Sequence, residues 1–114
     1  MAFTDLKTLT PRKKQILDTA QQLFSQQGFV SASMRDLAKE LDIKPPSLYS
    51  HYDSKNDILW EIALRCAQEF FQHVLPLAQG AALPEVRLKK MIRAHVEIIV
   101  KNMDASAIFF HEWQ

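Results

Sequence analysis

Residues that cross-link a chain or interrupt its helices are scarce in this sequence of 114 residues, which has one cysteine and two glycines. The single cysteine, Cys66, cannot form a disulfide within the chain, and its place on an apolar helical stripe predicts a small buried hydrophobe. No run of about eighteen apolar residues could span a membrane, and the N-terminal segment lacks the apolar region and cleavage site of a signal peptide. We therefore expect a cytoplasmic protein.

The residue groupings of common enzyme and metal sites are also missing. The sequence contains no Gly-rich phosphate loop and no Cys-x-x-Cys pair. Its histidines never stand four residues from one another or from the cysteine, and they are His51, His73, His95 and His111. Carboxylates close to two of them, Glu69 and Glu112, are explained by solvated helix surfaces. We expect no enzyme, no metal and no cofactor.

What the sequence does contain is helical periodicity, with 47% apolar residues and no useful strand alternation. Two early stripes predict amphipathic helices: Ile16, Leu17, Ala20, Leu23 and Phe24 form the first, and Met34, Leu37, Ala38 and Leu41 form the second. Thr10 and Pro11 are suited to begin the first helix and Gly28 to end it, while Ser33 is a good N-cap for the second. The fold should be all-α.

A third, very short helix follows after Asp42-Ile43-Lys44, beginning near Pro45, where a missing N–H costs little. Leu48 and Tyr52 share one face and should pack on the preceding helix. At roughly 100° per residue, the opposite face presents three small residues and its flanks two larger ones, namely Pro46, Ser47, Ser50, Tyr49 and His51. This order is typical of a helix-turn-helix that reads the DNA major groove.

Two other interpretations fit the same segment. It could be a solvated surface turn between two larger helices, or the scaffold of a helical protein-interaction module that does not bind specific DNA. Salt-dependent binding to duplex DNA separates these possibilities, since phosphate neutralisation makes affinity fall steeply with salt.

Residues 11–60 resemble the DNA-binding domain of the TetR family of bacterial transcriptional regulators. The matching elements are ILDTAQQLFSQQGF (16–29), MRDLAKEL (34–41), SLYSHY (47–52) and SKNDIL (54–59). The family usually has small or polar residues where this chain has Pro45 and Pro46. The resemblance implies a bacterial repressor that binds operator DNA and is released by a small-molecule effector, and it implies a homodimer in the intact protein.

Carried over by position, the resemblance also implies which residues touch DNA. Phosphate contacts are implied for Ser33, Tyr49, His51 and Lys55, and groove contacts for Arg35, Lys44, Pro46, Ser47 and Ser50. Ser33 can serve as an N-cap at the same time. Lys55 follows Ser54 at the positive end of a helix, which favours phosphate binding over a solvated surface lysine.

Charge is distributed unevenly, although the net charge is only +1. Residues 1–55 contain eight basic and six acidic side chains, a net of +2, and residues 56–114 contain six and seven, a net of −1. Arg12, Lys13 and Lys14 stand at the start of the first helix, where cations oppose the helix dipole. These three side chains could contact DNA phosphates, or they could equally be ordinary surface charges in contact with water.

The rest of the chain predicts helices that support the DNA-binding segment and helices that sense an effector. Ser54-x-x-Asp57 resembles a capping box, from which a long helix should run to about Pro76, followed by a loop over 77–84, a helix over about 85–103 and a sixth from about Ala105. We expect a DNA-binding domain at 1–54 and the start of a truncated regulatory domain at 55–114. TetR-like proteins usually run to nearly twice this length, so the chain is either a fragment or an unusual short form.

The resemblance further implies an effector cavity between the fourth, fifth and sixth helices. Its expected lining is Phe70, Met91, His95, Ile99, Met103 and Phe110, with His95 as the polar contact, and each residue could equally be plain core. The helices that make the family's dimer are absent here. We therefore expect this chain to be monomeric or weakly self-associating, with Phe109, Phe110 and Trp113 partly exposed.

Overall fold

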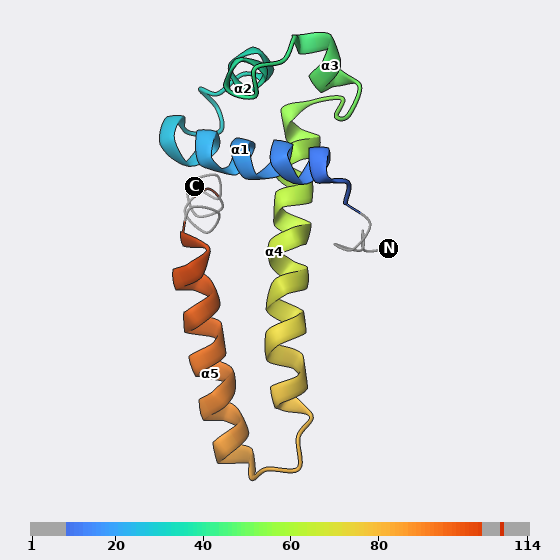
Figure 1. Ribbon diagram of the computed structural model, residues 1–114. Helices are drawn as coiled ribbons and strands as arrows, with labels where there is room; N and C mark the ends of the chain where they lie inside the picture. The colour runs from blue at the N-terminus through green and yellow to red at the C-terminus, as the bar shows by residue number, and fades with distance from the viewer. Residues whose placement is uncertain (1–8, 104–107, 109–114) are drawn as a thin grey trace.

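A computed structural model describes residues 9–103 and Ile108 of the chain. Its helices are α1 (Pro11–Gln27), α2 (Met34–Glu40), α3 (Pro45–Tyr49), α4 (Lys55–Ala78) and α5 (Pro84–Lys101). No strand occurs among the described residues, which confirms the all-α prediction. Figure 1 shows α1, α2 and α3 gathered at one end, with α4 leading away from them and α5 returning alongside α4. The molecule is therefore long, with principal extents of 54 × 29 × 23 Å.

The ends of α1 follow the predicted signals. The Thr10 hydroxyl accepts a hydrogen bond from the Lys13 backbone N–H at 3.2 Å, and Pro11 occupies the first turn. At the other end Gly28 has φ 81°, a conformation that side chains with a Cβ rarely adopt, and its N–H donates to the Phe24 carbonyl. These two ends fix the length of the helix that underlies the rest of the domain.

The turn between α2 and α3 depends on a less obvious residue. Asp42 has φ 54°, the left-handed conformation that Asp and Asn tolerate better than other non-glycine residues. The Ile43 N–H then donates to the Ala38 carbonyl at 3.0 Å, which closes the end of α2. We had expected Asp42 only to interrupt the apolar pattern, whereas in the structure its backbone makes the turn.

The predicted apolar stripes form the core. Every residue of the first two stripes is buried, and so are Leu48, Tyr52, Ile58 and Ile62. Ile108 is 3% exposed and belongs to the same cluster. Cys66 is only partly buried and packs against this core, in place of the full burial that we expected.

The boundaries of the long helices differ slightly from the predictions. Helix α4 continues through Pro76 to Ala78, because a proline in the last turn removes only one helical hydrogen bond. The loop is therefore shorter than expected, spanning 79–83, and α5 begins at Pro84. The Ser54 hydroxyl accepts from the Asp57 N–H at 3.3 Å, as the capping signal predicted. The expected sixth helix lies outside the described residues except for Ile108.

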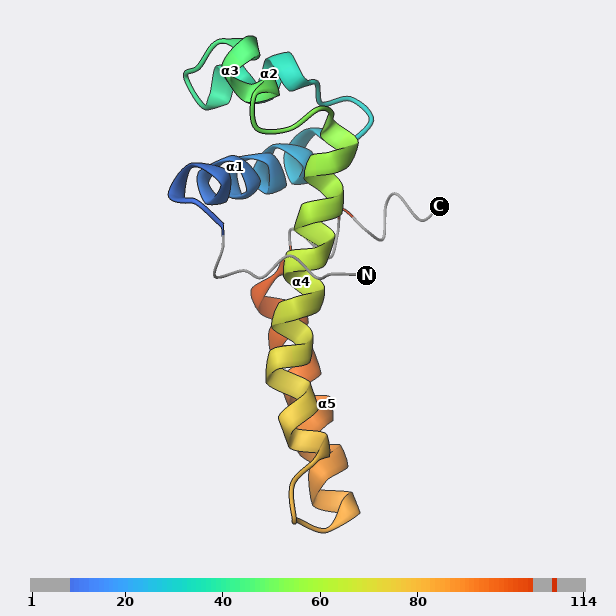
Figure 2. The same cartoon turned by 90° about the vertical axis from the view of Figure 1, so that its right-hand side faces the viewer.

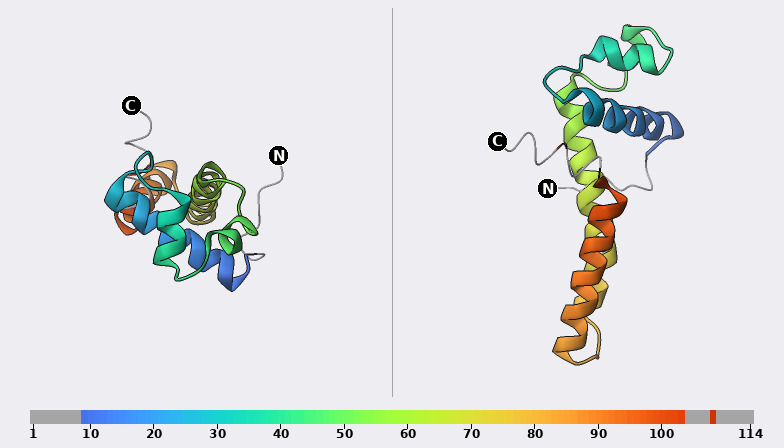
Figure 3. Two further views of the ribbon diagram at one scale, coloured as in Figure 1. Left: turned by 90° about the horizontal axis from the view of Figure 1, so that it is seen from above. Right: turned by 90° about the vertical axis from the view of Figure 1, so that its left-hand side faces the viewer.

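Figures 2 and 3 show that α4 and α5 run side by side along the long axis, while α1 crosses the upper part of α4. No helix among the described residues is long and apolar enough to cross a membrane.

Candidate nucleic-acid interface

The short helix α3 is held on the body of the domain by two buried side chains. Leu48 is fully buried and Tyr52 is 4% exposed, so the face that carries them is fixed against the core. The Tyr52 hydroxyl donates to a Glu61 carboxylate oxygen at 2.6 Å, which links the end of the α3 segment to α4. The orientation of α3 is therefore fixed by the packing of Leu48 and Tyr52 in the core and by the bond to Glu61.

The opposite face of α3 is open to solvent, as its sequence predicted. Pro46, Ser47 and Ser50 are exposed, Tyr49 is 50% exposed and His51 is partly buried. The Ser50 hydroxyl donates to the Ser47 carbonyl at 2.6 Å, so its proton is used within the helix while its oxygen remains free to accept. The hydroxyl of Ser47 is the second one on this face, and Ser47 is also exposed. Together they present small polar groups that fit close to base edges.

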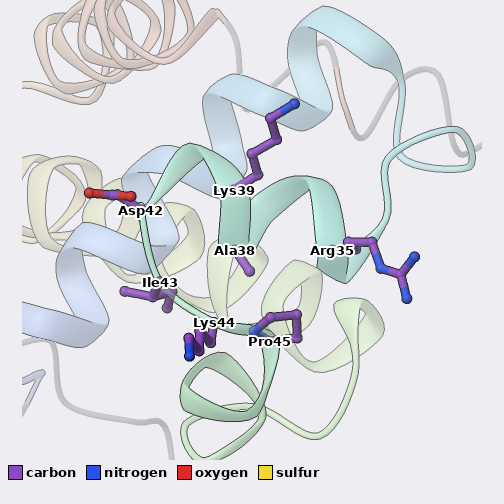
Figure 4. A pocket seen from close by; sticks show the side chains of 7 residues that line it. All are labelled: Arg35, Ala38, Lys39, Asp42, Ile43, Lys44 and Pro45. Atoms are coloured by element: carbon purple, nitrogen blue, oxygen red, sulfur yellow. The ribbon is translucent and has the colours of Figure 1, made fainter.

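A basic hollow of about 480 Å³ lies beside this face, where α2 meets the turn. Its lining residues, labelled in Figure 4, are Arg35, Ala38, Lys39, Asp42, Ile43, Lys44 and Pro45. Three of them are cations and one is an anion, so the hollow favours negative ligands. The sequence prediction included Arg35 and Lys44 and missed Lys39. Lys39 stands one helical turn after Arg35, and this spacing was the signal that could have found it.

A second hollow, of about 290 Å³, lies between the segment that follows α3 and the start of α4, and it has the opposite charge. Its lining residues are Ser50, His51, Tyr52, Asp53, Asp57, Trp60 and Glu61. Three carboxylates make this hollow acidic, whereas the basic hollow favours a phosphate. His51 lies at the edge of the acidic hollow, and a phosphate contact by His51 stays a prediction. The charge difference between the two hollows gives the exposed face of α3, which we call the reading face, a preferred side for a polyanion.

Ser33 has the structural role that we expected for it. Its hydroxyl accepts from the Asp36 N–H at 3.0 Å, and an Asp36 carboxylate oxygen accepts from the Ser33 N–H at 3.1 Å, which completes a capping box. Ser33 is exposed. A phosphate contact by Ser33 stays a prediction.

Lys55 has a different role from either of those predicted. Its ammonium donates to the carbonyl oxygens of Phe29 at 2.6 Å, Val30 at 3.1 Å and Ala32 at 2.9 Å, and lies 4.6 Å from the centre of the Phe29 ring. An ammonium has three N–H donors, and all three are used within the protein. In the structure Lys55 therefore ties the start of α4 to the loop between α1 and α2, and a phosphate contact by Lys55 stays an untested prediction.

Arg65 forms a second link between α4 and α1. Its guanidinium donates to Asp18 at 2.6 Å and to Gln21 at 2.8 Å. Together with Lys55 and the bond between Tyr52 and Glu61, it holds the first half of α4 at three points to the domain made of α1, α2 and α3, which we call the reading domain.

The cations at the start of α1 lie next to this assembly. Arg12 donates to Gln15 at 2.7 Å, and the Lys13 ammonium lies 5.2 Å from the centre of the Tyr52 ring. Lys14 is exposed. Two of the three cations thus have partners within the protein, and phosphate contact by any of them stays a prediction.

The residues expected around an effector cavity are only partly gathered. The rings of Phe70 on α4 and His95 on α5 meet edge to face with centroids 4.9 Å apart, and Met91 is partly buried. Ile99 and Met103 are 38% and 64% exposed. Phe110, like the predicted exposed residues Phe109 and Trp113, lies outside the described residues.

Titratable groups near the core are few. Burial, followed by the hydrogen bond to Glu61, raises the pKa of Tyr52 well above its usual value, and burial raises the pKa of the Cys66 thiol. In residues 9–103 and 108, no group of three or more His, Cys, Asp and Glu side chains could hold a metal ion.

Comparison with known proteins begins with the sequence. Residues 16–62 match the family described as bacterial regulatory proteins, tetR family. The biofilm operon icaADBC HTH-type negative transcriptional regulator IcaR of Staphylococcus aureus (strain Newman) is 36% identical over 68 residues, which are 60% of this chain and 36% of that protein. The HTH-type transcriptional regulator HbdR of Aromatoleum sp. (strain CIB) is 25% identical over 107 residues, 94% of this chain and 47% of that protein.

Solved structures give the same picture. The ketosteroid transcriptional regulator KstR2 of Mycobacterium tuberculosis superposes with a TM-score of 0.84 at 25% identity, over 92% of this chain and 54% of that chain. The TetR family transcriptional regulator PfmR from Thermus thermophilus gives a TM-score of 0.82 at 27% identity, over 90% of this chain and 55% of that chain. The chain thus spans about half the length of these structures and less than half of the two curated relatives.

Proposed function

We propose that the chain is a member of the TetR family of bacterial transcriptional regulators, which the match of residues 16–62 and the similar solved structures support, and that residues 1–54 bind operator DNA through α2 and α3. The observation that carries the proposal is the exposed small polar face of α3, held rigidly by Leu48 and Tyr52 beside the basic hollow. Residues 55–114 would then begin the helical regulatory domain.

In this proposal the contacts divide by chemistry. Ser47 and Ser50 face the base edges, with Pro46 in apolar contact, because their side chains are short enough for α3 to lie deep in the groove. Tyr49 and His51 on the flanks contact phosphates, as does Ser33. The resemblance implied groove contacts for Arg35 and Lys44; because they line the basic hollow together with Lys39, we assign all three to phosphates instead. Lys55 takes no part, since its ammonium is fully engaged.

We further propose that the intact protein acts in the cytoplasm as a repressor and is released by a small-molecule effector. The negative regulator IcaR, with 36% identity over the matched region, supports repression. The contact between Phe70 and His95 supports an apolar effector site with one polar group between α4 and α5. A homodimer of the intact protein would place two readers on successive turns of one DNA face, about 34–36 Å apart.

Substitutions on α3 test the proposed division of contacts. Affinities are measured for the preferred duplex and for duplexes that differ from it by single base pairs. Tyr49→Phe and His51→Ala should weaken binding to all duplexes by a similar factor, because phosphate contacts carry no sequence information. Ser47→Ala and Ser50→Ala should change the ranking of the duplexes, with each lost base contact worth about 1–3 kcal/mol.

Glu40→Ala, an exposed substitution on α2 outside both hollows, serves as the control and should leave the ranking unchanged. Equal and sequence-independent losses for all four variants would contradict the assignment of Ser47 and Ser50 to base edges. Binding that does not depend on salt would favour a protein-interaction module instead.

A further inference from the structure

Ser50, which follows the last residue of α3, has its hydroxyl proton committed within the protein. Its Oγ donates to the Ser47 carbonyl at 2.6 Å, and the residue is exposed. A hydroxyl has one proton to donate and two lone pairs that accept. In this conformation Ser50 can therefore accept a hydrogen bond from a ligand but cannot donate one.

The backbone around Ser50 has no N–H to offer either. The Ser50 N–H donates to the Pro46 carbonyl at 3.1 Å. The N–H groups of His51 and Tyr52 both donate to the Leu48 carbonyl, at 3.0 and 3.1 Å. All three N–H groups from 50 to 52 are thus used within the segment, so the backbone supplies no competing donor beside the Ser50 oxygen.

The charge near Ser50 favours a donor as its partner. Ser50 lines the acidic hollow together with the carboxylates of Asp53 and Asp57, and no lysine or arginine is among the lining residues of this hollow. Negative charge next to the Ser50 oxygen attracts the partly positive hydrogens of an amino group and repels a carbonyl oxygen. Hydrogen bonding and charge therefore select the same kind of partner.

Base edges in the major groove differ in this respect. Adenine N6 and cytosine N4 carry amino groups that donate, whereas guanine O6 and thymine O4 only accept. We propose that Ser50 selects an exocyclic amino group, that of adenine or of cytosine, at one base pair of the operator. The proposal rests on the proposed function and adds to it the class of base that faces Ser50.

Substitution of one base pair at a time in the preferred duplex tests the class of base. At one position the unchanged chain should bind duplexes with adenine or cytosine about two- to tenfold more tightly than those with guanine or thymine, which is the size of one hydrogen bond. Ser50→Ala should remove this preference. Ser47→Ala is the matched control, because it removes the other exposed hydroxyl of the same face. It should weaken binding through its own contact and keep the preference at the Ser50 position.

Removal of the amino group alone identifies the atom and separates the two bases. At that position adenine is replaced by purine, or cytosine by 2-pyrimidinone, each of which lacks the exocyclic amino group. A loss with purine assigns adenine, and a loss with 2-pyrimidinone assigns cytosine. The unchanged chain should lose about two- to tenfold in affinity, whereas Ser50→Ala should lose nothing further.

Two comparisons make this loss specific to the hydroxyl. Weaker base pairing by the analogue affects both chains equally and cancels when they are compared on the same duplexes. Ser50→Thr, which keeps a hydroxyl, should retain the loss. Circular dichroism establishes that both variants keep their helices.

Three results would overturn this proposal and leave the proposed function standing. The first is a position at which Ser50→Ala removes a preference for guanine or thymine. The second is a Ser50→Ala chain that binds all duplexes more weakly by one factor while Ser47→Ala still changes their ranking, since Ser50 would then contact a phosphate. The third is a loss on amino-group removal that Ser50→Ala shares in full at every position. A chain that prefers no duplex would overturn the proposed function and this proposal together.

Discussion

Single side chains decide how firmly the reading domain is joined to α4, and Tyr52 shows how. Its ring belongs to the core, and its hydroxyl donates to Glu61 at 2.6 Å. Burial and this hydrogen bond raise the pKa of Tyr52, because both disfavour the phenolate in the folded state. The neutral phenol is therefore part of the stable fold.

The raised pKa predicts a loss of stability at high pH. The contribution is complete below the unfolded-state pKa of about 10 and is lost as the pH rises above it, because the unfolded chain then releases a proton that the folded chain retains. Between about pH 9.5 and 11.5 the free energy of unfolding should fall more steeply for the unchanged chain than for Tyr52→Phe. Urea unfolding across this range measures the slope.

The exposed Tyr49 provides the control for this comparison, and Tyr49→Phe should follow the unchanged chain. At neutral pH, Tyr52→Phe should cost about 1–3 kcal/mol through the lost hydrogen bond to a carboxylate. Identical slopes for the Tyr52→Phe and unchanged chains would show that the hydroxyl is not buried against Glu61.

Between elements, the strongest connection is made by Lys55, which bonds three carbonyls of the loop between α1 and α2. Removing the ammonium leaves those carbonyls with fewer partners and frees the loop that leads to Ser33. Lys55→Met should therefore lower the free energy of unfolding by about 1.5–3 kcal/mol, the range for hydrogen bonds to charged groups. Lys14→Met, at an exposed position of α1, should change it little.

DNA binding separates this role from phosphate contact. Loss of one phosphate contact reduces the slope of log affinity against log salt by about 1. Lys44→Met should show that reduction, and Lys55→Met should keep the slope of the unchanged chain. A reduced slope for Lys55→Met, with unchanged stability, would restore the phosphate role that the sequence suggested.

The elements themselves were predictable because their signals are local. Thr10, Gly28 and Ser33 mark helix ends through hydrogen bonds to residues within four positions, and Pro11 does so through its fixed backbone angle. Helical spacing identified the buried faces. The link that Lys55 makes in the structure was not predicted, because its partners lie 23 to 26 residues away. Sequence spacing carries no information about such a contact. The same limit explains why the links of Arg65 to Asp18 and Gln21 were missed.

Prediction of the candidate site follows the same division. The exposed face of α3 was predicted because five residues of one short segment determine it, and the exposures of Pro46, Ser47 and Ser50 agree with it. The helix itself ends earlier than the pattern implied, at Tyr49. The basic hollow was found only in part, since it forms where α2 meets the turn made by Asp42. The expected effector lining depends on how α4 and α5 pack, which the sequence does not reveal. In the structure Met91 lies on the partly buried face of α5, whereas Ile99 and Met103 are exposed.

At the scale of the whole molecule, the reading domain and α4 form one connected body, and α5 presents an apolar face along its length. Links through Lys55, Glu61 and Arg65 join α4 to α1, to the loop after it and to the end of α3. A displacement of α4 would therefore carry the reading face with it. If the proposed function holds, these links would carry a change near Phe70 and His95 to α3.

The central claim, that α3 reads DNA sequence, is tested most directly by selecting bound duplexes from a random pool with the unchanged 114-residue chain. The account predicts that successive rounds converge on a short shared motif, and that affinity for this motif falls linearly on a plot of log affinity against log salt. A pool that gains no shared motif, or binding that is unaffected by salt, would contradict it.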